Sequence, residues 1–323
     1  MKYTTTQAAA LEMNRLGREG APFLFAFDYE MKSAFVVPNP LKQDKVMFAF
    51  PGCSNRTVCR PLVNPTIVPH NISYEAYKKG FDVIYAALVR GDSYLANYTV
   101  RTPIDMPHSL GDVFDAATAP FCLMVPGRFV CFSPERFVRI DGGSIYTYPM
   151  KGTIDASVPN AESVILKDCK EAAEHVTVVD LLRNDLGMVA NDVEVRRFRY
   201  IDRLETAQRS ILQVSSQIVG RMSDGWSKEI GSIMMKILPA GSICGAPKES
   251  TRRAIAEAEA MPRGFYAGVF GVYDGKILDT AVLIRFIEQD GDAFYYRSGG
   301  GITVNSSSRK EYEEVINKIY LPS

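Results

Sequence analysis

Apolar residues recur at helical spacing in five stretches of the chain. The first predicted helix is capped by Ser73, buries Tyr77, Phe81 and Ile84, and ends before Gly91. The same periodicity predicts further helices over residues 161–186 and 226–237, from Pro247 to about residue 262, and from Ser308 onward, where Ser308 and Glu311 have the spacing of a capping box.

Alternating apolar and polar residues predict β-hairpins between these helices. The turn sequences are Asp141-Gly142-Gly143, Asp274-Gly275 and Asp290-Gly291, each flanked by residues rich in Val, Ile, Phe and Tyr. Hairpins imply antiparallel sheet, and the helices are not placed in a βαβ alternation. The pattern therefore predicts an α+β fold and not a doubly wound sheet.

The least regular stretch lies between Phe50 and His70, where four prolines occur among few periodic apolar positions. We interpret it as a loop that joins a β-rich N-terminal part, residues 1–70, to the main body, residues 71–323. No repeat or Gly/Ser linker divides the sequence, so a single domain over residues 1–323 is expected.

Charge and composition exclude some classes of function. The 37 Lys and Arg residues balance the 37 Asp and Glu residues, which argues against a protein that binds nucleic acid or membrane surfaces through bulk charge. No apolar run is long enough to span a membrane, and the N-terminal 20 residues contain no apolar core of a secretory signal.

The six cysteines form no CxxC pair and have no paired histidine spacing. They are expected to be reduced, mostly buried thiols, and a cytoplasmic location follows. A histidine-based zinc site is not expected, because the chain has only 3 histidines.

Glu135 and Lys151 are the first residues that suggest chemistry. They flank the Asp141-Gly142-Gly143 turn at equal distances, so in a straight hairpin an acid and an amine would face each other across two strands. A buried carboxyl group could then donate a proton, and an amine with a depressed pKa could act as a nucleophile. From spacing alone, a solvated cross-strand ion pair is the more common outcome.

The predicted helix over residues 161–186 carries Glu174, His175 and Asp185. Glu174 and Asp185 are about three helical turns apart and share one face, which could bind Mg²⁺ through a carboxylate and substrate oxygens. A capping and ion-pair cluster at the helix end explains Asp185 equally well.

Two segments of small residues could bind an anion. One runs from Pro239 to Lys248 into a helix N-terminus, and the other is the Gly-rich stretch 298–302, interpreted as a loop after a strand. Each alone is weak evidence, but with Arg285, whose guanidinium can clamp a carboxylate, they suggest a small dianionic substrate. Glu314, four residues before Lys318, would by itself be read as a surface ion pair.

Taken together, six segments resemble the chorismate-utilising enzymes, which include anthranilate, aminodeoxychorismate, isochorismate and salicylate synthases. The matching segments, in the family's order, are SPERF, MKGT, AEHVTVVDLLRNDLG, LPAGSICGAPK, RSGGGI and EYEEVINK. The resemblance implies two packed antiparallel sheets with helices outside, an active site between the sheets, and a chorismate-binding core in residues 71–323.

The resemblance also implies roles for single residues. Glu174 and Glu314 would bind Mg²⁺, and Glu135 would protonate the departing C4 hydroxyl group. The implied substrate-binding residues are Thr153, Gln213, Ser242, Lys248, Arg285, Gly299, Gly300, Gly301 and Ile302.

Lys151 distinguishes among the members of the family. Aminodeoxychorismate synthases have a lysine in this motif that is thought to add to the ring at C2, whereas anthranilate synthases have alanine. The lysine with which isochorismate and salicylate synthases activate water corresponds to Leu95, which cannot act as a base. The resemblance therefore implies an aminodeoxychorismate synthase component I, with anthranilate synthase component I and an inactive chorismate-binding homologue as alternatives.

In the implied reaction Lys151 adds to C2, the C4 hydroxyl leaves as water, and ammonia adds at C4 and expels the lysine. The product would be 4-amino-4-deoxychorismate, the precursor of p-aminobenzoate and folate. The sequence has no glutaminase elbow, so ammonia would come from a glutamine amidotransferase partner or from solution. Two positions depart from the family pattern: Gln213 replaces a histidine, and Val272 replaces a tyrosine.

Overall fold

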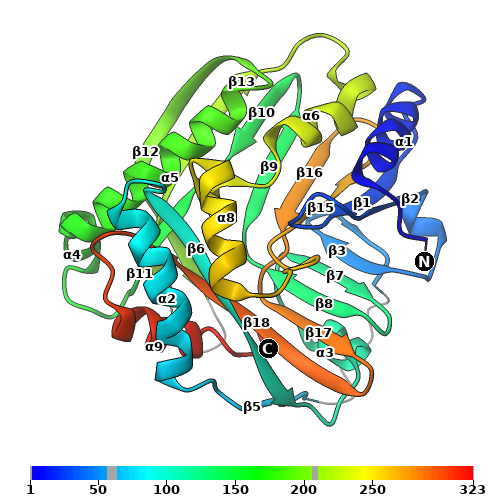
Figure 1. The fold of residues 1–323 in the computed structure, drawn as a ribbon. Helices are drawn as coiled ribbons and strands as arrows, with labels where there is room; N and C mark the ends of the chain where they lie inside the picture. Colours follow the sequence, from blue (N-terminus) through cyan, green and yellow to red (C-terminus); the bar gives the residue numbers. More distant parts are fainter. Residues whose placement is uncertain (1, 57–63, 206–209, 323) are drawn as a thin grey trace.

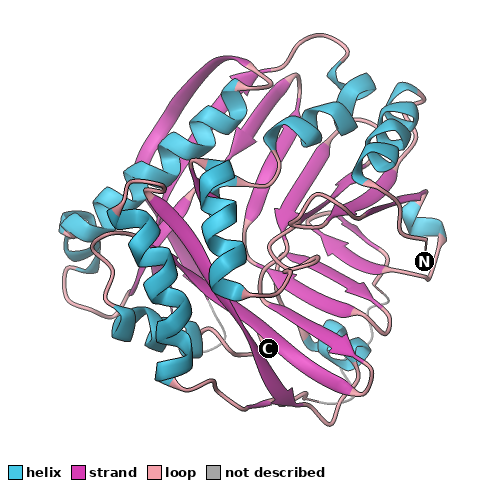
Figure 2. Ribbon diagram, viewed as in Figure 1, coloured by secondary structure: helices cyan, strands magenta, loops and turns pink. Residues whose placement is uncertain are grey.

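Two antiparallel β-sheets form the centre of the protein and helices lie around them (Figure 1, Figure 2). The structure is a computed structural model that describes residues 2–56, 64–205 and 210–322. All strand pairs in the described residues are antiparallel, which confirms the predicted α+β class with a two-layer core.

The first sheet has the strand order β11-β13-β10-β9-β16-β15-β1-β2, with β12 paired to β13. Its strands are β1 (Phe23–Phe27), β2 (Ala34–Pro38), β9 (Arg136–Asp141), β10 (Ser144–Thr147), β11 (Met150–Asp155), β12 (Asn191–Glu205), β13 (Ser210–Arg221), β15 (Val269–Tyr273) and β16 (Leu278–Val282).

The second sheet has the order β14-β6-β18-β17-β8-β7-β3-β4, with β5 paired to β6. Its strands are β3 (Met47–Phe50), β4 (Cys53–Ser54), β5 (Val68–Pro69), β6 (Leu95–Asp105), β7 (Phe121–Val125), β8 (Phe129–Ser133), β14 (Gly245–Ala246), β17 (Phe286–Asp290) and β18 (Ala293–Ile302).

Aromatic side chains fill the space between the sheets. The rings of Phe50 on β3 and Phe270 on β15 lie 5.1 Å apart, edge to face, and so join the second sheet to the first. Phe23, Phe25 and Phe27 on β1 are fully buried in the same core. Because each buried aromatic side chain removes a large apolar area from water, this layer accounts for much of the stability of the fold.

The helices lie along the sheets and at their ends. They are α1 (Thr6–Arg18), α2 (Tyr74–Val89), α3 (Leu110–Ala116), α4 (Ala161–Lys167), α5 (Cys169–Gly187), α6 (Ile230–Ile237), α7 (Gly241–Cys244), α8 (Lys248–Glu259) and α9 (Ser308–Asn317), with short 3₁₀ turns η1 (Pro40–Lys42) and η2 (Trp226–Glu229). Figure 1 shows α2 and α8 side by side against β6, while α5 packs against β11 and β13 and α9 against β18. Among the described residues no helix is long and apolar enough to cross a membrane.

Most predicted helices and turns are confirmed, with changes at their ends. Ser73 caps α2, and the three Gly-containing turns join β9 to β10, β15 to β16 and β17 to β18. The helix predicted over residues 161–186 is two helices, because Asp168 leaves helical geometry and its side chain accepts the backbone N–H of Glu171 to begin α5. The predicted capping box is wrong: Ser307 is the N-cap of α9, and the Ser308 hydroxyl contacts the Tyr74 hydroxyl at 2.8 Å.

The N-terminal part differs from the prediction in helix α1 and in the short strands β4 and β5, which lie within the predicted loop. It begins with helix α1, whose side chains Ala9, Met13 and Leu16 are buried, before the strands that enter both sheets. Of the predicted loop between Phe50 and His70, residues 57–63 lie outside the described part. The five cysteines in the described residues are free thiols, and only Cys169 is exposed.

The predicted pairing of Glu135 with Lys151 across a hairpin is wrong. The chain leaves β10 after Thr147 and returns as β11 on the far side of β13, so β13 separates the two strands. The Gly-rich stretch 298–302 is also a strand and not a loop, because it forms the end of β18 and pairs with β6. A Cβ atom at Gly299 would lie 2.6 Å from the Thr99 side chain, which explains the need for glycine there.

Candidate active site

A cavity of about 300 Å³ lies between β11, β13, the end of β18, α7 and α9. It brings together side chains that are far apart in the sequence, among them Glu135, Lys151, Gln213, Arg285 and Glu314. The hairpin that would have joined Glu135 to Lys151 does not exist, yet both residues line this one cavity.

Lys151 projects from β11 and forms an ion pair with Glu174 of α5. The two side-chain atoms, Nζ and Oε2, are 2.8 Å apart, and the Glu174 side chain is only 9% exposed. Burial lowers the pKa of Lys151, but the carboxylates of Glu174, Glu314 and Glu171 together outweigh burial, so the net pKa is raised. Lys151 is therefore an ammonium in the free protein, and the expected depression of its pKa is not found.

Gly152 lets the chain pass close to α5 just after Lys151. Its φ is +86°, a conformation that side-chain-bearing residues rarely adopt, and a Cβ atom here would lie 3.2 Å from Glu171 Oε2. The sequence requirement for glycine after the lysine is thus conformational.

Glu135 lies at the end of β8, where its chain turns into β9. Its carboxyl group is hydrogen-bonded to the Ser242 hydroxyl of α7. Burial raises the pKa of Glu135, against the smaller lowering effects of Ser242 and of the Lys318 ammonium. The environment therefore favours a protonated carboxyl group, which is the form that can donate a proton.

The end of α9 contributes a second carboxylate–amine pair. Glu314 Oε1 lies 2.6 Å from Lys318 Nζ, which also donates to the Gly299 carbonyl at 2.8 Å. The predicted i,i+4 pair therefore exists, but both residues line the cavity.

Three carboxylates lie near enough to the Lys151 ammonium to stabilise its charge. Glu174, Glu314 and Glu171 all raise its pKa. A Cβ atom at Gly300 would lie 3.6 Å from oxygens of both Glu311 and Glu314, so this glycine leaves space beside them.

The chemistry of these donors suits a hard divalent cation. All are carboxylate oxygens, which Mg²⁺ prefers. Among the described residues no three carboxylate, imidazole or thiol groups converge closely enough to hold a metal ion by themselves. A Mg²⁺ ion at these carboxylates would therefore need further ligands from substrate and water, as is common for this ion.

Arg285 lies between β16 and β17 with an unusual backbone. Its φ is +54°, a left-handed conformation that costs on the order of 1 kcal/mol for a residue with a side chain. Its guanidinium donates to the Lys318 carbonyl at 3.0 Å and lies over the Tyr320 ring. Neither contact supplies a negative charge, so Arg285 is well placed to bind a carboxylate.

The structure does not bring every predicted residue to the cavity wall. Lys248 pairs with Asp185 at 2.7 Å and donates to the Ile237 carbonyl at 2.8 Å, and it is not among the described residues that line the cavity. The expected contact of Lys248 with substrate finds no support in this geometry. Thr153 lines an adjoining cavity of about 450 Å³ that shares Lys151 and Glu314 with the first.

Of the remaining predicted residues, Gln213 lines the cavity from β13, opposite Thr153. Ser242 and Gly299 also line it. Gly301 and Ile302 continue β18 beyond the cavity, and Ile302 is fully buried.

His175 follows Glu174 on α5 and packs against β13. Its ring is fully buried, its Nε2 atom lies 2.7 Å from the Ser216 hydroxyl, and burial lowers its pKa to about 4. A neutral ring next to Glu174 thus contacts β13, the strand that carries Gln213.

Sequence reasoning missed several residues of the wall. Tyr266, Lys318 and Ser298 all line the cavity. Burial raises the pKa of the Tyr266 hydroxyl to about 12, so the hydroxyl is a hydrogen-bond donor at neutral pH. Lys318 had only the i,i+4 spacing with Glu314 as a signal, and its role depends on tertiary contacts.

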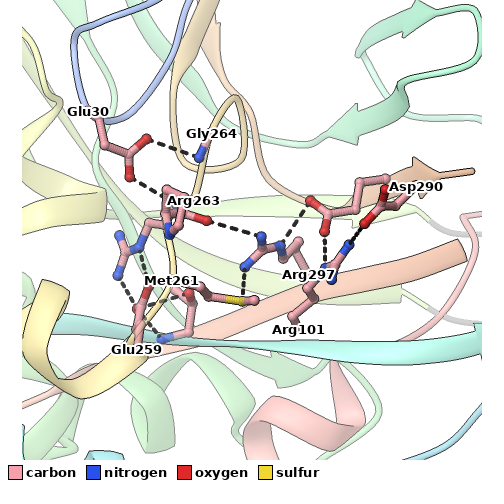
Figure 3. Close-up of polar contacts among 11 residues, drawn as sticks. Glu30, Arg101, Glu259, Met261, Arg263, Gly264, Asp290 and Arg297 are labelled. Atoms are coloured by element: carbon pink, nitrogen blue, oxygen red, sulfur yellow. Dashed lines mark hydrogen bonds and ion pairs between the residues drawn. The ribbon is translucent and has the colours of Figure 1, made fainter.

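A network of paired charges reaches the cavity at Arg297 (Figure 3). Arg297 lines the cavity, pairs with Glu288 at 3.1 Å and donates to the Pro262 carbonyl. Arg263 is 1% exposed, pairs with Glu259 at 2.6 Å and lines another cavity of about 530 Å³ beside α8. In that larger cavity the buried charges satisfy each other, so we place the chemistry in the smaller one.

The arrangement contains the groups for acid catalysis and for binding an anion at one place. Glu135 can donate a proton, Lys151 can act as a nucleophile once it loses its proton, and Arg285 can bind a carboxylate.

Comparison with known proteins identifies relatives along most of the chain. The sequence profile of a family described as chorismate binding enzyme matches residues 54–322. An uncharacterised PabA-like protein of Haemophilus influenzae is 44% identical over 323 residues, covering 100% of this chain and 98% of that protein.

Two relatives with stated activities are more distant and longer. Anthranilate synthase component 1 of Aeropyrum pernix is 32% identical over 76% of this chain and 60% of its own length. Aminodeoxychorismate synthase component 1 of Salmonella typhimurium is 30% identical over 77% of this chain and 57% of its own length. The menaquinone-specific isochorismate synthase of Escherichia coli has the same fold, with a TM-score of 0.75, 15% identity, and coverage of 98% and 82% of the two chains.

Proposed function

The chain belongs to the chorismate-binding enzyme family, and we propose that it aminates chorismate at C4 as an aminodeoxychorismate synthase component I. The product would be 4-amino-4-deoxychorismate, the precursor of p-aminobenzoate and folate. Relatives named anthranilate synthase component 1 are 32% to 37% identical to this chain, and the one named aminodeoxychorismate synthase component 1 is 30% identical, so overall similarity does not favour C4 over C2 amination.

The observation that supports C4 amination is the position of Lys151. Its amine lines the same cavity as the Glu135 carboxyl group. Anthranilate synthases, by the resemblance described above, have alanine at this position and need no lysine, because ammonia itself enters at C2.

Each step of the reaction is assigned to a residue of the cavity. Glu135, whose pKa is raised by burial, donates its proton to the C4 hydroxyl, which leaves as water. The Lys151 ammonium loses a proton to solvent, and the neutral amine attacks C2 and forms a covalent intermediate as the bond from C4 to oxygen breaks. Ammonia then adds at C4, the ring double bonds shift back, and the bond from C2 to Lys151 breaks.

Glu174 and Glu314 would hold Mg²⁺, with Glu171 and Glu311 beside them. When bound there, Mg²⁺ would supply positive charge that fixes a substrate carboxylate and disfavours the Lys151 ammonium. Arg285 would hold the second carboxylate of chorismate, and the apolar core behind the cavity would limit access of water.

Ammonia would come from a glutamine amidotransferase subunit. The adjoining cavity shares Lys151, Gly152, Glu314 and Lys318 with the first and so reaches the same amine from another side. A second substrate could therefore approach while chorismate occupies the first cavity.

The test is to incubate the purified chain with chorismate, Mg²⁺ and ammonium and to identify the product by mass and chromatography. We expect a product that an aminodeoxychorismate lyase converts to p-aminobenzoate. Anthranilate as the product would overturn the C4 assignment. No turnover, even with an added glutaminase subunit, would indicate a homologue that binds chorismate without aminating it.

A further inference from the structure

The hydroxyl of Ser298 is buried and has no hydrogen-bond partner among the described residues. The residue is 3% exposed and lines the cavity described above. Leaving a buried hydroxyl without a partner costs about 1–3 kcal/mol, so native proteins rarely retain one without a reason. A serine hydroxyl turns readily between staggered rotamers, and a ligand in the cavity can satisfy it.

Ser298 lies in a row of residues on β18 that faces α9. Alternate residues of a strand point to the same face, which places Tyr296, Ser298 and Gly300 together. Tyr296 donates its hydroxyl to the Tyr320 carbonyl, and the missing side chain of Gly300 leaves space beside Glu311 and Glu314. Ser298 is the member of this row with a free donor.

The charge of the cavity indicates what its ligand offers to that donor. Four cationic side chains line the cavity, Lys151, Arg285, Arg297 and Lys318, against the carboxyl groups of Glu135 and Glu314. Three of these cations have carboxylate partners: Lys151 pairs with Glu174, Arg297 with Glu288 and Lys318 with Glu314. Arg285 has no negative partner in the contacts the structure gives it, so its guanidinium can attract an oxyanion to the cavity.

We propose that the Ser298 hydroxyl donates a hydrogen bond to a carboxylate of chorismate and so helps to set the specificity of the cavity. This inference rests on the proposed function only for the identity of the ligand. A hydrogen bond from a neutral hydroxyl to a carboxylate is charge-assisted and stronger than one between neutral groups. In the absence of ligand the same hydroxyl lowers the stability of the protein.

The hydrogen bond to the ligand and the stability cost in its absence predict opposite effects of one substitution. In Ser298→Ala the affinity for chorismate should fall about tenfold or more, while the unfolding midpoint of the free protein stays the same or rises. With ammonium present, KM should rise and kcat should change little, because the bond is made in the ground state as well as in the transition state. Binding is measured by calorimetry in a Lys151→Arg background, so that no covalent step follows.

Thr102 provides a matched control. Its hydroxyl is also buried and without a partner, on the neighbouring strand β6, but it is not among the described residues that line the cavity. Thr102→Val, which keeps the shape of the side chain, should leave both KM and chorismate affinity unchanged.

An affinity of Ser298→Ala within twofold of its parent would overturn the inference. So would a fall in the unfolding midpoint of the free variant, because it would assign the hydroxyl a structural role. If the Lys151→Arg parent itself does not bind chorismate, the proposed function fails instead. If the wild-type product is anthranilate, the C4 assignment fails but the result for Ser298 stands.

Discussion

The Lys151 ammonium and the Glu174 carboxylate lie 2.8 Å apart in a pocket where Glu174 is 9% exposed. Neither residue can change its charge without affecting the other, because burial weakens solvation of both. The free protein therefore keeps Lys151 in its unreactive, protonated form. The amine becomes a nucleophile only when another positive charge neutralises the Glu174 carboxylate, so that Lys151 can lose its proton.

The pKa of Glu135 predicts a link between stability and acid catalysis. Because burial raises this pKa in the folded protein, the folded state holds the proton more tightly than the unfolded chain, and stability is lost as pH rises above the ordinary value of 4.5. Glu135→Gln should therefore unfold at a higher temperature than wild type at neutral pH, with the difference shrinking toward acid pH, while turnover falls by about 100-fold or more. Thermal unfolding across a pH series checks this, and superimposable curves would refute the burial argument.

The carboxylates of α5 and α9 predict a dependence on Mg²⁺. Chelation of divalent ions should abolish turnover, and addition of Mg²⁺ should restore it. Glu314→Gln should raise the Mg²⁺ concentration for half-maximal activity at least about tenfold, because one of two carboxylates is lost. Glu313→Gln is the control, since Glu313 lies on the same helix with a side chain that is 60% exposed and contacts Arg309. Equal Mg²⁺ dependence of both variants would contradict the assignment.

Lys248 is predicted to act on stability and not on substrate. Its removal in Lys248→Met leaves Asp185, whose side chain is 6% exposed, without a cation. We expect a loss of about 2 kcal/mol in the free energy of unfolding, less than for a fully buried pair because Lys248 is partly exposed. Urea denaturation measures this loss, the double variant Asp185→Asn/Lys248→Met should recover part of it, and KM for chorismate should not change. A tenfold rise in KM would contradict this prediction and indicate that Lys248 binds substrate.

His175 predicts a loss of stability in weak acid. Its pKa is about 4 in the folded protein, below the ordinary 6.5, so the unfolded chain takes up the proton first and stability falls as pH drops from about 6.5 to about 4. The full effect is on the order of 3 kcal/mol. His175→Gln should lack this part of the pH dependence, whereas His70→Gln, which changes a ring that is 56% exposed, should retain it. An identical loss of stability at acid pH in wild type and His175→Gln would contradict the prediction.

Local patterns in the sequence were sufficient to predict several elements. Helical spacing and Ser73 located α2, and Gly-containing turns located three hairpins. Helix α1 has a similar pattern, with Thr5 as its cap and Ala9, Met13 and Leu16 buried, but its low apolar content hid it among polar residues. Asp168 was read as part of one long helix because capping by an aspartate depends on backbone geometry that the spacing does not fix.

The site required tertiary information that local patterns lack. Symmetry about a turn predicts that Glu135 and Lys151 face each other across a hairpin, but β13 lies between β10 and β11, and the two residues share only the cavity that both line. Family motifs predict metal-binding roles for Glu174 and Glu314, and the structure places Glu174 beside Lys151 and Glu314 on the cavity wall. Ser298 and Tyr266 had no local signal, because what distinguishes them is the cavity that they line.

The central claim is that the amine of Lys151 forms a bond to C2 of chorismate. Incubation of the protein with chorismate and Mg²⁺ in the absence of ammonia should leave this bond in place, since no second nucleophile arrives to break it. Lys151→Arg keeps a positive charge beside Glu174 and should fold with a similar unfolding midpoint, but its guanidinium, with a pKa above about 12, cannot lose its proton to attack.

Intact-mass spectrometry of the two proteins after this incubation tests the claim most directly. The account predicts that the wild-type chain gains the mass of chorismate less one water, that peptide mapping places the gain on Lys151, and that Lys151→Arg gains nothing. An unmodified wild-type chain that nevertheless aminates chorismate at C4 when ammonium is added would contradict it.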